Sequence, residues 1–367
     1  MLAWRDRLLT SPEFQRRSMH FPIARGIARR RMRALFDLCG GFIYSQVLLA
    51  CTRLKVFERV ADAPQSAAQL AEALAVPVDS MQRLLDAAQS LQLLEHRGNH
   101  AFGLGPLGAA LIGNPSVGMM IEHHQALYAD LNDPIALMRG ESSSRGLAKY
   151  WAYSKHAQPS SLGADDTRAY SELMAASQIM IADQVLTAYP MRRHRRLIDI
   201  GGGAGAFTLA AMQAQRQLHA CVFDLPAVCD HALVRFEQAG VSDRGSVHGG
   251  DFTRDPLPTG FDLLSFVRVL HDHDDKVVIA LLRAARAAMD DDATLLIAEP
   301  LLGTPGAEPV GAAYFGFYLM AMGQGRPRSA KMLKDMLTEA GFMQVREHRT
   351  YAPLLVRVLT AKPGPTG

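Results

Sequence analysis

LIDIGGGAGAF, residues 197–207, decides the fold because it joins an apolar run to a cluster of glycines. Leu197, Ile198 and Ile200 are typical of a parallel strand that is covered on both faces. The glycines allow positive φ angles and close approach of a ligand, and helical spacing resumes from Ala206 with free N–H groups at the helix start. The pattern predicts a strand, a loop and a helix that together bind a nucleoside.

The glycine spacing by itself leaves the nucleotide open. Gly201, Gly203 and Ala206 also satisfy the G-x-G-x-x-G/A dinucleotide pattern, with Asp224 at a suitable distance for a ribose contact. A glycine turn that binds nothing is a further alternative, although such a glycine cluster weakens strand and helix without a compensating gain. The segments that follow in the chain are needed to distinguish these alternatives.

Four further segments have the spacing of strands in one α/β sheet. They lie at residues 221–224, 246–250, 261–270 and 293–299, with helical patterns between them. Ligands of open α/β sheets bind beyond the carboxyl ends of the strands, so polar residues at those ends meet at one edge. We expect the following side chains there: Asp199, Asp224, Asp251, His271 and Glu299.

Three positions at this edge have a role if the ligand is S-adenosylmethionine (SAM). Asp224 is placed to accept hydrogen bonds from both ribose hydroxyls and Asp251 from the adenine amino group, while Phe252 can lie against the adenine face. Acids at strand ends are also common turn residues. It is their order along the chain that favours the cofactor.

Four motifs together resemble those of the plant-type O-methyltransferase family, whose members are class I enzymes that use SAM. They are LIDIGGGAGAF, FDLP at residues 223–226, GGDF at 249–252 and VLHDHDD at 269–275. The resemblance implies an α/β fold with a Rossmann-like SAM-binding sheet, a helical winged-helix dimerisation domain at residues 1–165, a catalytic domain at 166–367, and a homodimer. It also implies that SAM, which becomes S-adenosylhomocysteine, is bound by Gly201, Gly203, Asp224, Asp251, Phe252 and Arg268.

In this family the fourth strand leads to a His-Asp-Trp element whose histidine is the general base. Here the element is His271-Asp272-His273, so the resemblance implies that His271 is the base and Glu299 the acid that orients it. The plant enzymes carry a second glutamate, and Pro327 stands in its place here. The acid partner of His271 is therefore Glu299 alone, or Asp272 takes part as well.

The same cluster contains H-x-H-x-D, a pattern found in dinuclear metallohydrolases. That pattern needs a histidine directly after the last aspartate, and Lys276 stands there instead. Imidazole and carboxylate suit zinc, but no other His/Cys pair has ligand spacing, so we expect no metal. The acids at residues 272–275 also suit the start of a helix over residues 276–289.

The composition is that of a globular protein large enough for two domains, with 367 residues, 49% of them hydrophobic and 20% charged. The four cysteines have no C-x-x-C spacing, and the start of the chain lacks the apolar core of a secretory signal. No uninterrupted apolar run reaches the roughly 18 residues that span a bilayer. These features favour a cytoplasmic location.

Positive charge is concentrated at the start of the chain. Residues 1–35 contain nine arginines against Asp6 and Glu13, a balance of +7 in a chain of net charge +3. An apolar stretch follows at residues 35–54. Basic side chains beside apolar ones suit peripheral attachment to an anionic membrane; a dimerisation arm with solvated arginines is an equally good alternative, and the two are compatible.

Residues 66–112 have the pattern of a winged helix, with two amphipathic helices followed by a hairpin. Such modules often read DNA. The helix that would enter the groove, residues 79–93, carries only Arg83 as a basic residue, which is poor equipment for binding phosphates. We expect no nucleic-acid partner, and the family resemblance implies dimer packing and one wall of the substrate pocket.

Two helical stripes rich in methionine and aromatic residues flank the predicted sheet, at residues 166–189 and 312–322. Such stripes are often ordinary core, but these side chains also adapt to a long apolar ligand. The second stripe precedes Gly-Gln-Gly at residues 323–325, where the family lines its acceptor pocket. We assign to substrate binding Tyr170, Met174, Tyr314, Phe317, Tyr318 and Met322.

Within the family, residues 29–54, 150–154 and 320–329 are most similar to the branch that methylates the tertiary 1-hydroxy group of acyclic carotenoids in photosynthetic bacteria. The resemblance implies a hydrophobic hydroxycarotenoid as acceptor and a location on the intracytoplasmic membrane. A branch that methylates C-20 of bacteriochlorophyllide is the main competitor. Outside the family, the alternatives are an NAD-linked oxidoreductase and a SAM-binding winged-helix regulator without turnover.

Overall fold

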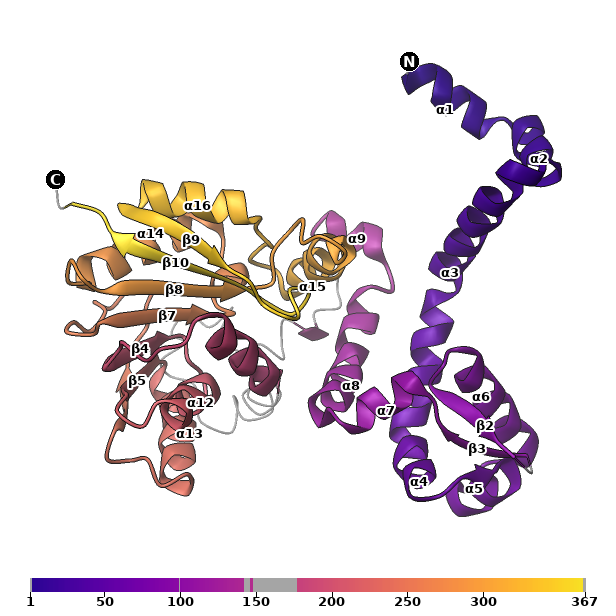
Figure 1. The fold of residues 1–367 in the computed structure, drawn as a ribbon, viewed down its shortest axis with the longest axis horizontal. Coiled ribbons are helices and arrows are strands. Elements are labelled where there is room, and N and C mark those ends of the chain that lie inside the picture. The colour runs from indigo at the N-terminus through magenta and orange to yellow at the C-terminus, as the bar shows by residue number, and fades with distance from the viewer. Residues whose placement is uncertain (1, 99, 142–145, 148–176, 366–367) are drawn as a thin grey trace. The chain divides into compact units, whose positions relative to one another are not determined.

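The computed structural model describes residues 2–98, 100–141, 146–147 and 177–365. The chain forms two compact units, residues 1–122 and 123–367, and each is described by itself. In Figure 1 the first unit runs from indigo to magenta and the second from magenta to yellow. The domain boundary expected between residues 165 and 166 lies outside the described residues and stays a prediction.

The first unit is mainly helical. Its helices are α1 (Leu2–Thr10), α2 (Pro12–His20), α3 (Pro22–Arg53), α4 (Val56–Asp62), α5 (Ala67–Leu74), α6 (Val78–Ser90), α7 (Pro106–Ile112) and the first half of α8 (Pro115–Asp130). A small antiparallel sheet has the order β1 (Gln65–Ser66), β3 (Ala101–Leu104), β2 (Leu94–Arg97). The expected pattern of two helices and a hairpin is confirmed.

Local sequence explains the start of α5 and the core beside it. The Ser66 side chain accepts a hydrogen bond from the N–H of Gln69, and the Gln69 side chain accepts one from the N–H of Ser66, which is a capping box. Leu70 of α5, Leu85 of α6 and Phe102 of β3 then meet in one hydrophobic cluster. The cap and the apolar spacing together fix this module.

α3 extends well beyond its packing. Near its C-terminal end Leu49 and Cys51 are buried, whereas every residue from 29 to 39 is exposed. By length and composition alone this helix could cross a membrane, which corrects the expectation drawn from the sequence. Asp37 and Ser45 interrupt the apolar run but not the helix, and the Ser45 hydroxyl donates within the helix to the carbonyl of Phe42 at 2.9 Å.

The second unit contains a seven-stranded sheet with the order β6 (Gly245–Gly249), β5 (His219–Asp224), β4 (Arg196–Ile200), β7 (Leu263–Val267), β8 (Thr294–Glu299), β10 (Arg357–Pro363), β9 (Phe342–His348). The first five strands are parallel, and β10 pairs antiparallel with both β8 and β9. The five predicted strands are present. The fourth is shorter than expected because the chain turns into a 3-10 helix at Leu270–Asp272.

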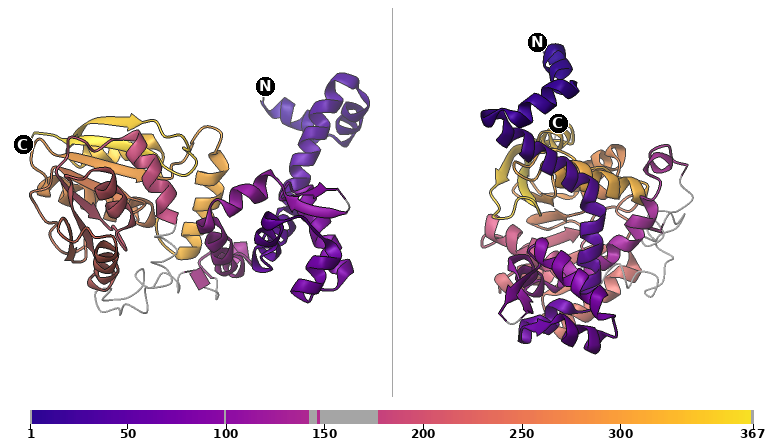
Figure 2. Two further views of the ribbon diagram at one scale, coloured as in Figure 1. Left: turned by 60° about the horizontal axis from the view of Figure 1, so that its bottom comes forward. Right: turned by 90° about the vertical axis from the view of Figure 1, so that its right-hand side faces the viewer.

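Helices cover both faces of this sheet (Figures 1 and 2). α14 (Asp275–Ala288) and α16 (Ala330–Glu339) pack on one face, and residues 177–188, α12 (Ala206–Ala214) and α13 (Pro226–Gln238) pack on the other. Neighbouring residues of β4 point to opposite faces, with Leu197 in the second cluster and Ile198 in the first. The ends of the parallel strands are thereby held at one edge.

A smaller helical cluster belongs to the same unit. It contains the second half of α8, α9 (Pro134–Met138) and α15 (Phe315–Met322), with a π-helix at Val310–Tyr314 directly before α15. Leu127, Leu319 and Met322 are buried in its core. Phe315, at the start of α15, lies edge-on to His271 with ring centroids 5.7 Å apart, so this cluster borders the edge of the sheet.

Candidate active site

The loop between β4 and α12 is shaped by glycines at positive φ. Gly201, Gly203 and Gly205 have φ of +69°, +59° and +70°. A Cβ on Gly201 would lie 2.8 Å from the Val269 side chain, and one on Gly205 would lie 3.0 Å from Phe236. Near Gly203, by contrast, no described atom lies within 4 Å of that position. This glycine opens onto free space at the end of β4, as a ligand-binding loop requires.

Asp224, at the end of β5, lies beside this loop. Its Oδ2 accepts a hydrogen bond from the N–H of Gly203 at 2.8 Å, and its Oδ1 accepts one from the N–H of Leu225 at 2.7 Å. Burial raises the pKa of Asp224 to about 6. The carboxylate is therefore mainly ionised at neutral pH, and its remaining lone pairs can accept hydrogen bonds from ligand hydroxyls.

Asp199 does not reach the edge where we expected it. It is buried beneath the loop, where its carboxylate accepts hydrogen bonds from Ser265 Oγ at 2.6 Å and Thr208 Oγ1 at 3.1 Å. Burial raises its pKa to about 7. The side chain points inward because alternate residues of a strand face opposite sides, and it supports the loop from below.

Asp251 and Phe252 follow β6. Asp251 Oδ1 accepts hydrogen bonds from the N–H and the hydroxyl of Thr253, at 2.9 and 2.6 Å, so part of its carboxylate holds a turn. The Phe252 ring lies edge-on to His273, 5.3 Å between centroids. A ring carbon of Phe252 is also 3.5 Å from where a Cβ of Gly201 would be, so this ring borders the glycine loop.

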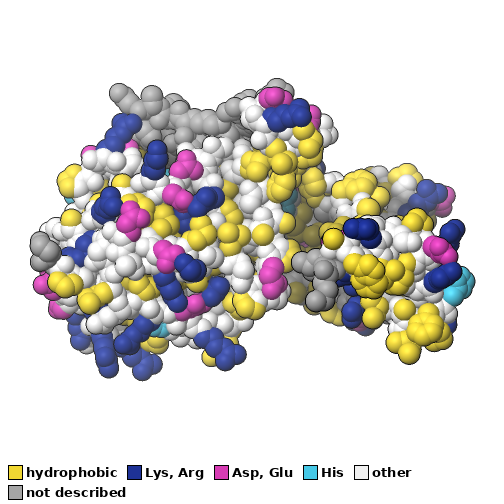
Figure 3. Space-filling model, turned by 90° about the horizontal axis from the view of Figure 1, so that it is seen from above, with side chains coloured by type: hydrophobic (Ala, Val, Ile, Leu, Met, Phe, Trp, Pro, Cys, Tyr) yellow, Lys and Arg dark blue, Asp and Glu magenta, His cyan; other side chains and the backbone are white. Residues whose placement is uncertain are grey.

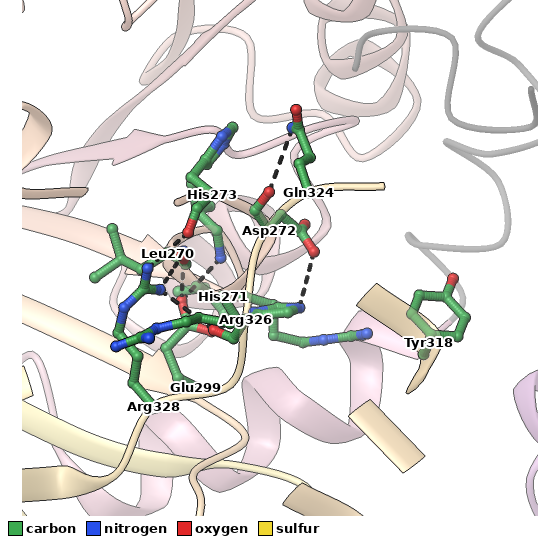
Figure 4. A network of polar contacts seen from close by, with 12 residues as sticks. Leu270, His271, Asp272, His273, Glu299, Tyr318, Gln324, Arg326 and Arg328 are labelled. Atoms are coloured by element: carbon green, nitrogen blue, oxygen red, sulfur yellow. Dashed lines mark hydrogen bonds and ion pairs between the residues drawn. The ribbon is translucent and has the colours of Figure 1, made fainter. Parts of the chain in front are cut away.

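Glu299, at the end of β8, holds the segment that carries His271 (Figure 4). Its Oε1 accepts hydrogen bonds from the N–H groups of Val269 and Leu270, at 2.9 and 2.7 Å, and its Oε2 contacts Nδ1 of His271. Glu299 is 1% exposed and His271 6%. Because a carboxylate accepts and does not donate, Nδ1 carries the hydrogen and Nε2 faces the other way.

Asp272 flanks the other side of the imidazole. Its Oδ1 lies 3.2 Å from Nε2 of His271. Burial disfavours the imidazolium, but the carboxylates of Asp272 and Glu299 outweigh this effect and raise the pKa of His271 above its ordinary value. Burial also raises the pKa of Asp272. The histidine thus lies between two acids, one at each ring nitrogen.

The other polar side chains of this cluster have separate partners. His273 lies against Phe252, and burial lowers its pKa to about 4. Asp274 stands at the N-cap of α14, yet its carboxylate accepts a hydrogen bond from the N–H of Gly325 rather than capping the helix. Within the part of the chain that is described, no three His, Cys, Asp or Glu side chains gather to hold a metal.

Residues 323–328 pack against the segment that carries His271 and hydrogen-bond to it. Arg328 is 2% exposed and donates to the carbonyls of Leu270 and His273, both at 2.7 Å, and to Asp275 Oδ1 at 2.7 Å. Gly325 has φ +81°, and a Cβ there would lie 2.4 Å from the carbonyl oxygen of His271. The role of Arg328 was not predicted from the sequence, where its signal is a charged residue beside a glycine-rich turn.

Two histidine–tyrosine pairs lie on the side of α15. Nε2 of His123 is 2.8 Å from the hydroxyl of Tyr318, and Nε2 of His124 is 2.8 Å from the hydroxyl of Tyr314. Burial lowers the pKa of His123 to about 4 and raises that of Tyr314 to about 12, so these groups are neutral. The histidines were not identified from the sequence.

The remaining candidates have different positions. Arg268 has φ +59°, a strained value for a residue with a side chain, and its guanidinium donates to Ser177 Oγ at 2.9 Å. Phe317 is 36% exposed, while Met322 is 1% exposed in the core of the helical cluster. Two more candidates lie outside the described residues, namely Tyr170 and Met174. All these assignments stay predictions.

The chain matches two domain families. Residues 128–343 match an O-methyltransferase domain, and residues 36–114 match an O-methyltransferase dimerisation domain, which indicates a homodimer. Demethylspheroidene O-methyltransferase of Cereibacter sphaeroides is 38% identical over 97% of this chain and 93% of the relative, and that of Rhodobacter capsulatus is 38% identical over 94% and 85%. The structure of human N-acetylserotonin methyltransferase with SAM has the same fold, with a TM-score of 0.74, 24% identity, and coverage of 91% and 98%.

Proposed function

Because this chain belongs to the SAM-dependent O-methyltransferase family and is such an enzyme, we propose that it methylates the tertiary 1-hydroxy group of an acyclic carotenoid, with His271 as general base. The observation that carries the mechanism is the position of His271, whose Nδ1 is held by Glu299. The carotenoid acceptor is supported by the two demethylspheroidene O-methyltransferases, which resemble this chain along most of its length.

The residues at the edge of the sheet fit SAM. Gly203 leaves open space beside the end of β4, and the Asp224 carboxylate stands next to it to accept the ribose hydroxyls. We assign the adenine to the side of Asp251 and Phe252, with the aromatic ring against its face. When bound, SAM supplies an electrophilic methyl group on a sulfonium sulfur.

His271 removes the proton of the acceptor hydroxyl at Nε2, and Glu299 stabilises the imidazolium that results through Nδ1. We assign the orienting role to Glu299 because its other oxygen is fixed by two backbone N–H groups. Asp272 lies where the acceptor hydroxyl must approach Nε2, so its carboxylate gives way to the acceptor. A tertiary alcohol is a very weak acid, so alignment of the reactants contributes much of the rate.

The acceptor pocket is assigned to the side of α15. The Tyr314 and Tyr318 rings stack on each other with centroids 5.9 Å apart, and their hydroxyls are paired with His124 and His123. An apolar chain can pack against these two rings without breaking the hydrogen bonds of their hydroxyls.

A methyl-transfer assay tests the acceptor. Radiolabelled SAM is supplied with a detergent-solubilised 1-hydroxycarotenoid, and a bacteriochlorophyllide and a small catechol serve as parallel acceptors. Label in the carotenoid alone is the expected result. Label only in another acceptor contradicts the carotenoid assignment but keeps the enzyme class.

The base is tested in the same assay. We expect His271→Ala to lower turnover by about 10²–10⁴-fold, the usual contribution of a positioned base, while the affinity for S-adenosylhomocysteine changes little. His219→Ala is the matched control, because this histidine is exposed at the start of β5, away from the carboxyl ends of the strands. A wild-type rate in His271→Ala removes the base assignment.

A further inference from the structure

We propose that residues 1–35 form a docking surface for an anionic lipid membrane. The proposed chemistry uses none of these residues, and the matched dimerisation domain begins only at residue 36. The surface consists of α1, α2 and the first part of α3. We call it the N-terminal basic surface.

The charge of this surface is strongly one-sided. It contains nine arginines and two acids. Each acid already pairs with an arginine, Asp6 with Arg5 and Glu13 with Arg17. The remaining arginines therefore keep a positive charge that the segment does not offset. Each arginine near an anionic lipid surface contributes to binding, and the contributions add up across a cluster.

Apolar side chains are exposed on the same surface. Six large ones are between 49% and 81% exposed: Trp4, Phe21, Ile23, Ile27, Met32 and Leu35. At the right of Figure 3, where α1 and α2 face the viewer, hydrophobic side chains lie interspersed with basic ones. Bulky apolar groups among arginines are the composition of helices that lie in a membrane interface.

One side of the first part of α3 carries a stripe of arginines, and the roughly opposite side carries two isoleucines together with Arg30 and Arg31. Arg25, Arg29 and Arg33 recur every four residues and so form one stripe. Ile23 and Ile27 lie one turn apart on the roughly opposite side, at about 100° per residue. The helix can therefore lie parallel to a membrane, with the isoleucines toward the acyl chains and the arginines, Arg30 and Arg31 included, extended toward the headgroups.

The geometry favours a surface position over a span. Leu49 and Cys51 are buried within the first unit, and the part of α3 between Arg33 and Leu49, residues 34–48, contains no arginine or lysine. At about 1.5 Å per residue this part is roughly 22 Å long, shorter than the roughly 30 Å hydrocarbon core. Four arginines at residues 29–33 directly precede this part.

A second copy of the chain is a poorer partner for this surface. A two-fold contact through residues 1–35 would place this surface against its own copy. Two segments with a net charge of +7 each would then lie against one another. Like charges brought together at an interface oppose association. An anionic lipid surface supplies the opposite charge together with an apolar layer.

Co-sedimentation of the full-length protein with lipid vesicles tests the charge. The vesicles are made of phosphatidylcholine alone or mixed with phosphatidylglycerol, and we expect binding mainly to the mixed vesicles. The triple variant Arg29→Gln, Arg30→Gln, Arg33→Gln should bind these about a hundredfold more weakly. The matched control, Arg192→Gln, Arg193→Gln, Arg195→Gln, removes the same charge from exposed positions of the second unit and should bind like the wild type.

The apolar part is tested by Ile23→Ser with Ile27→Ser, for which we expect at least about tenfold weaker binding. Leu233→Ser with Val234→Ser is the matched control, since these α13 side chains are 45% and 51% exposed. Affinity for S-adenosylhomocysteine shows that each variant is folded. Equal binding to both vesicle types, an equal loss in the controls, or dissociation of the dimer by the arginine changes would each overturn the proposal.

Discussion

His271 lies between two carboxylates, and this single residue sets the expected pH dependence. Catalysis needs the neutral imidazole, whereas Asp272 and Glu299 stabilise the charged form and raise its pKa. We therefore expect kcat/KM to rise with pH through a pKa above the ordinary value of about 6.5. Asp272→Asn removes one of the raising charges and should move this limb to lower pH.

The pH profile of kcat/KM for the wild type and for Asp272→Asn is the measurement. Asp274→Asn is the control, because that carboxylate bonds to Gly325 and not to the imidazole. Because the pKa of His271 is higher in the folded than in the unfolded protein, its contacts with the two carboxylates stabilise the fold below about pH 6.5. This contribution is lost as the pH rises through the pKa of His271 in the folded protein. A limb that stays in place or moves to higher pH would contradict the assigned role of Asp272.

Asp224 leads to a prediction about cofactor affinity. Its pKa of about 6 in the ligand-free protein means that protonation removes the charged acceptor as pH falls through this value. Affinity for S-adenosylhomocysteine should therefore decline below about pH 6, and Asp224→Asn should lower it roughly 10- to 100-fold at neutral pH, as for hydrogen bonds to a charged group. Calorimetric titration across this range measures both effects, with Asp230→Asn on the exposed side of α13 as control. Unchanged affinity in Asp224→Asn would exclude the ribose contact.

At the scale of elements, Arg328 joins the turn after α15 to the 3-10 helix and to α14. Its buried guanidinium satisfies two carbonyls and Asp275. Arg328→Met leaves the carbonyls of Leu270 and His273 without this donor, and at about 1–3 kcal/mol for each group we expect about 2–6 kcal/mol less free energy of unfolding. Arg326→Met should cost under about 1 kcal/mol, because Arg326 bonds the same Asp275 with a half-exposed side chain. Urea unfolding measures the free energy of unfolding of both variants. Equal losses in the two variants would contradict the special role of the buried Arg328 side chain.

The sequence predicted the elements whose signals are local. The loop at residues 197–207 and its glycines follow from neighbouring residues, and Glu299 was found because strands end at regular spacing. The pairing of His123 with Tyr318 joins positions 195 residues apart, so no local pattern contains it. Likewise, the carbonyl partners of Arg328 exist only after two loops have met. β9 was missed because most of its side chains are exposed, several of them polar, and they do not alternate with buried ones.

At the scale of the whole molecule, the exposed section of α3 within the dimerisation domain predicts where two subunits meet. Leu38, Phe42 and Ile43 are 81%, 66% and 53% exposed and lie within the matched residues 36–114. Leu38→Asp with Phe42→Asp should convert the dimer to a monomer, because a buried interface cannot solvate the new charges. Analytical ultracentrifugation measures this, with Leu354→Asp in the second unit as control. A dimer that persists in the double variant would place the interface elsewhere.

β10 is synthesised after every other strand of the sheet, yet it lies between β8 and β9 and pairs Arg357 with Glu299. Until residue 363 has left the ribosome, the edge of β8 stays open, and the acid that orients His271 stands at the end of this unfinished edge. The nascent chain can thus assemble its nucleoside-binding half early but reaches catalytic competence only after translation of the sheet is complete. During that interval the open edge is a site for mispairing between neighbouring nascent chains.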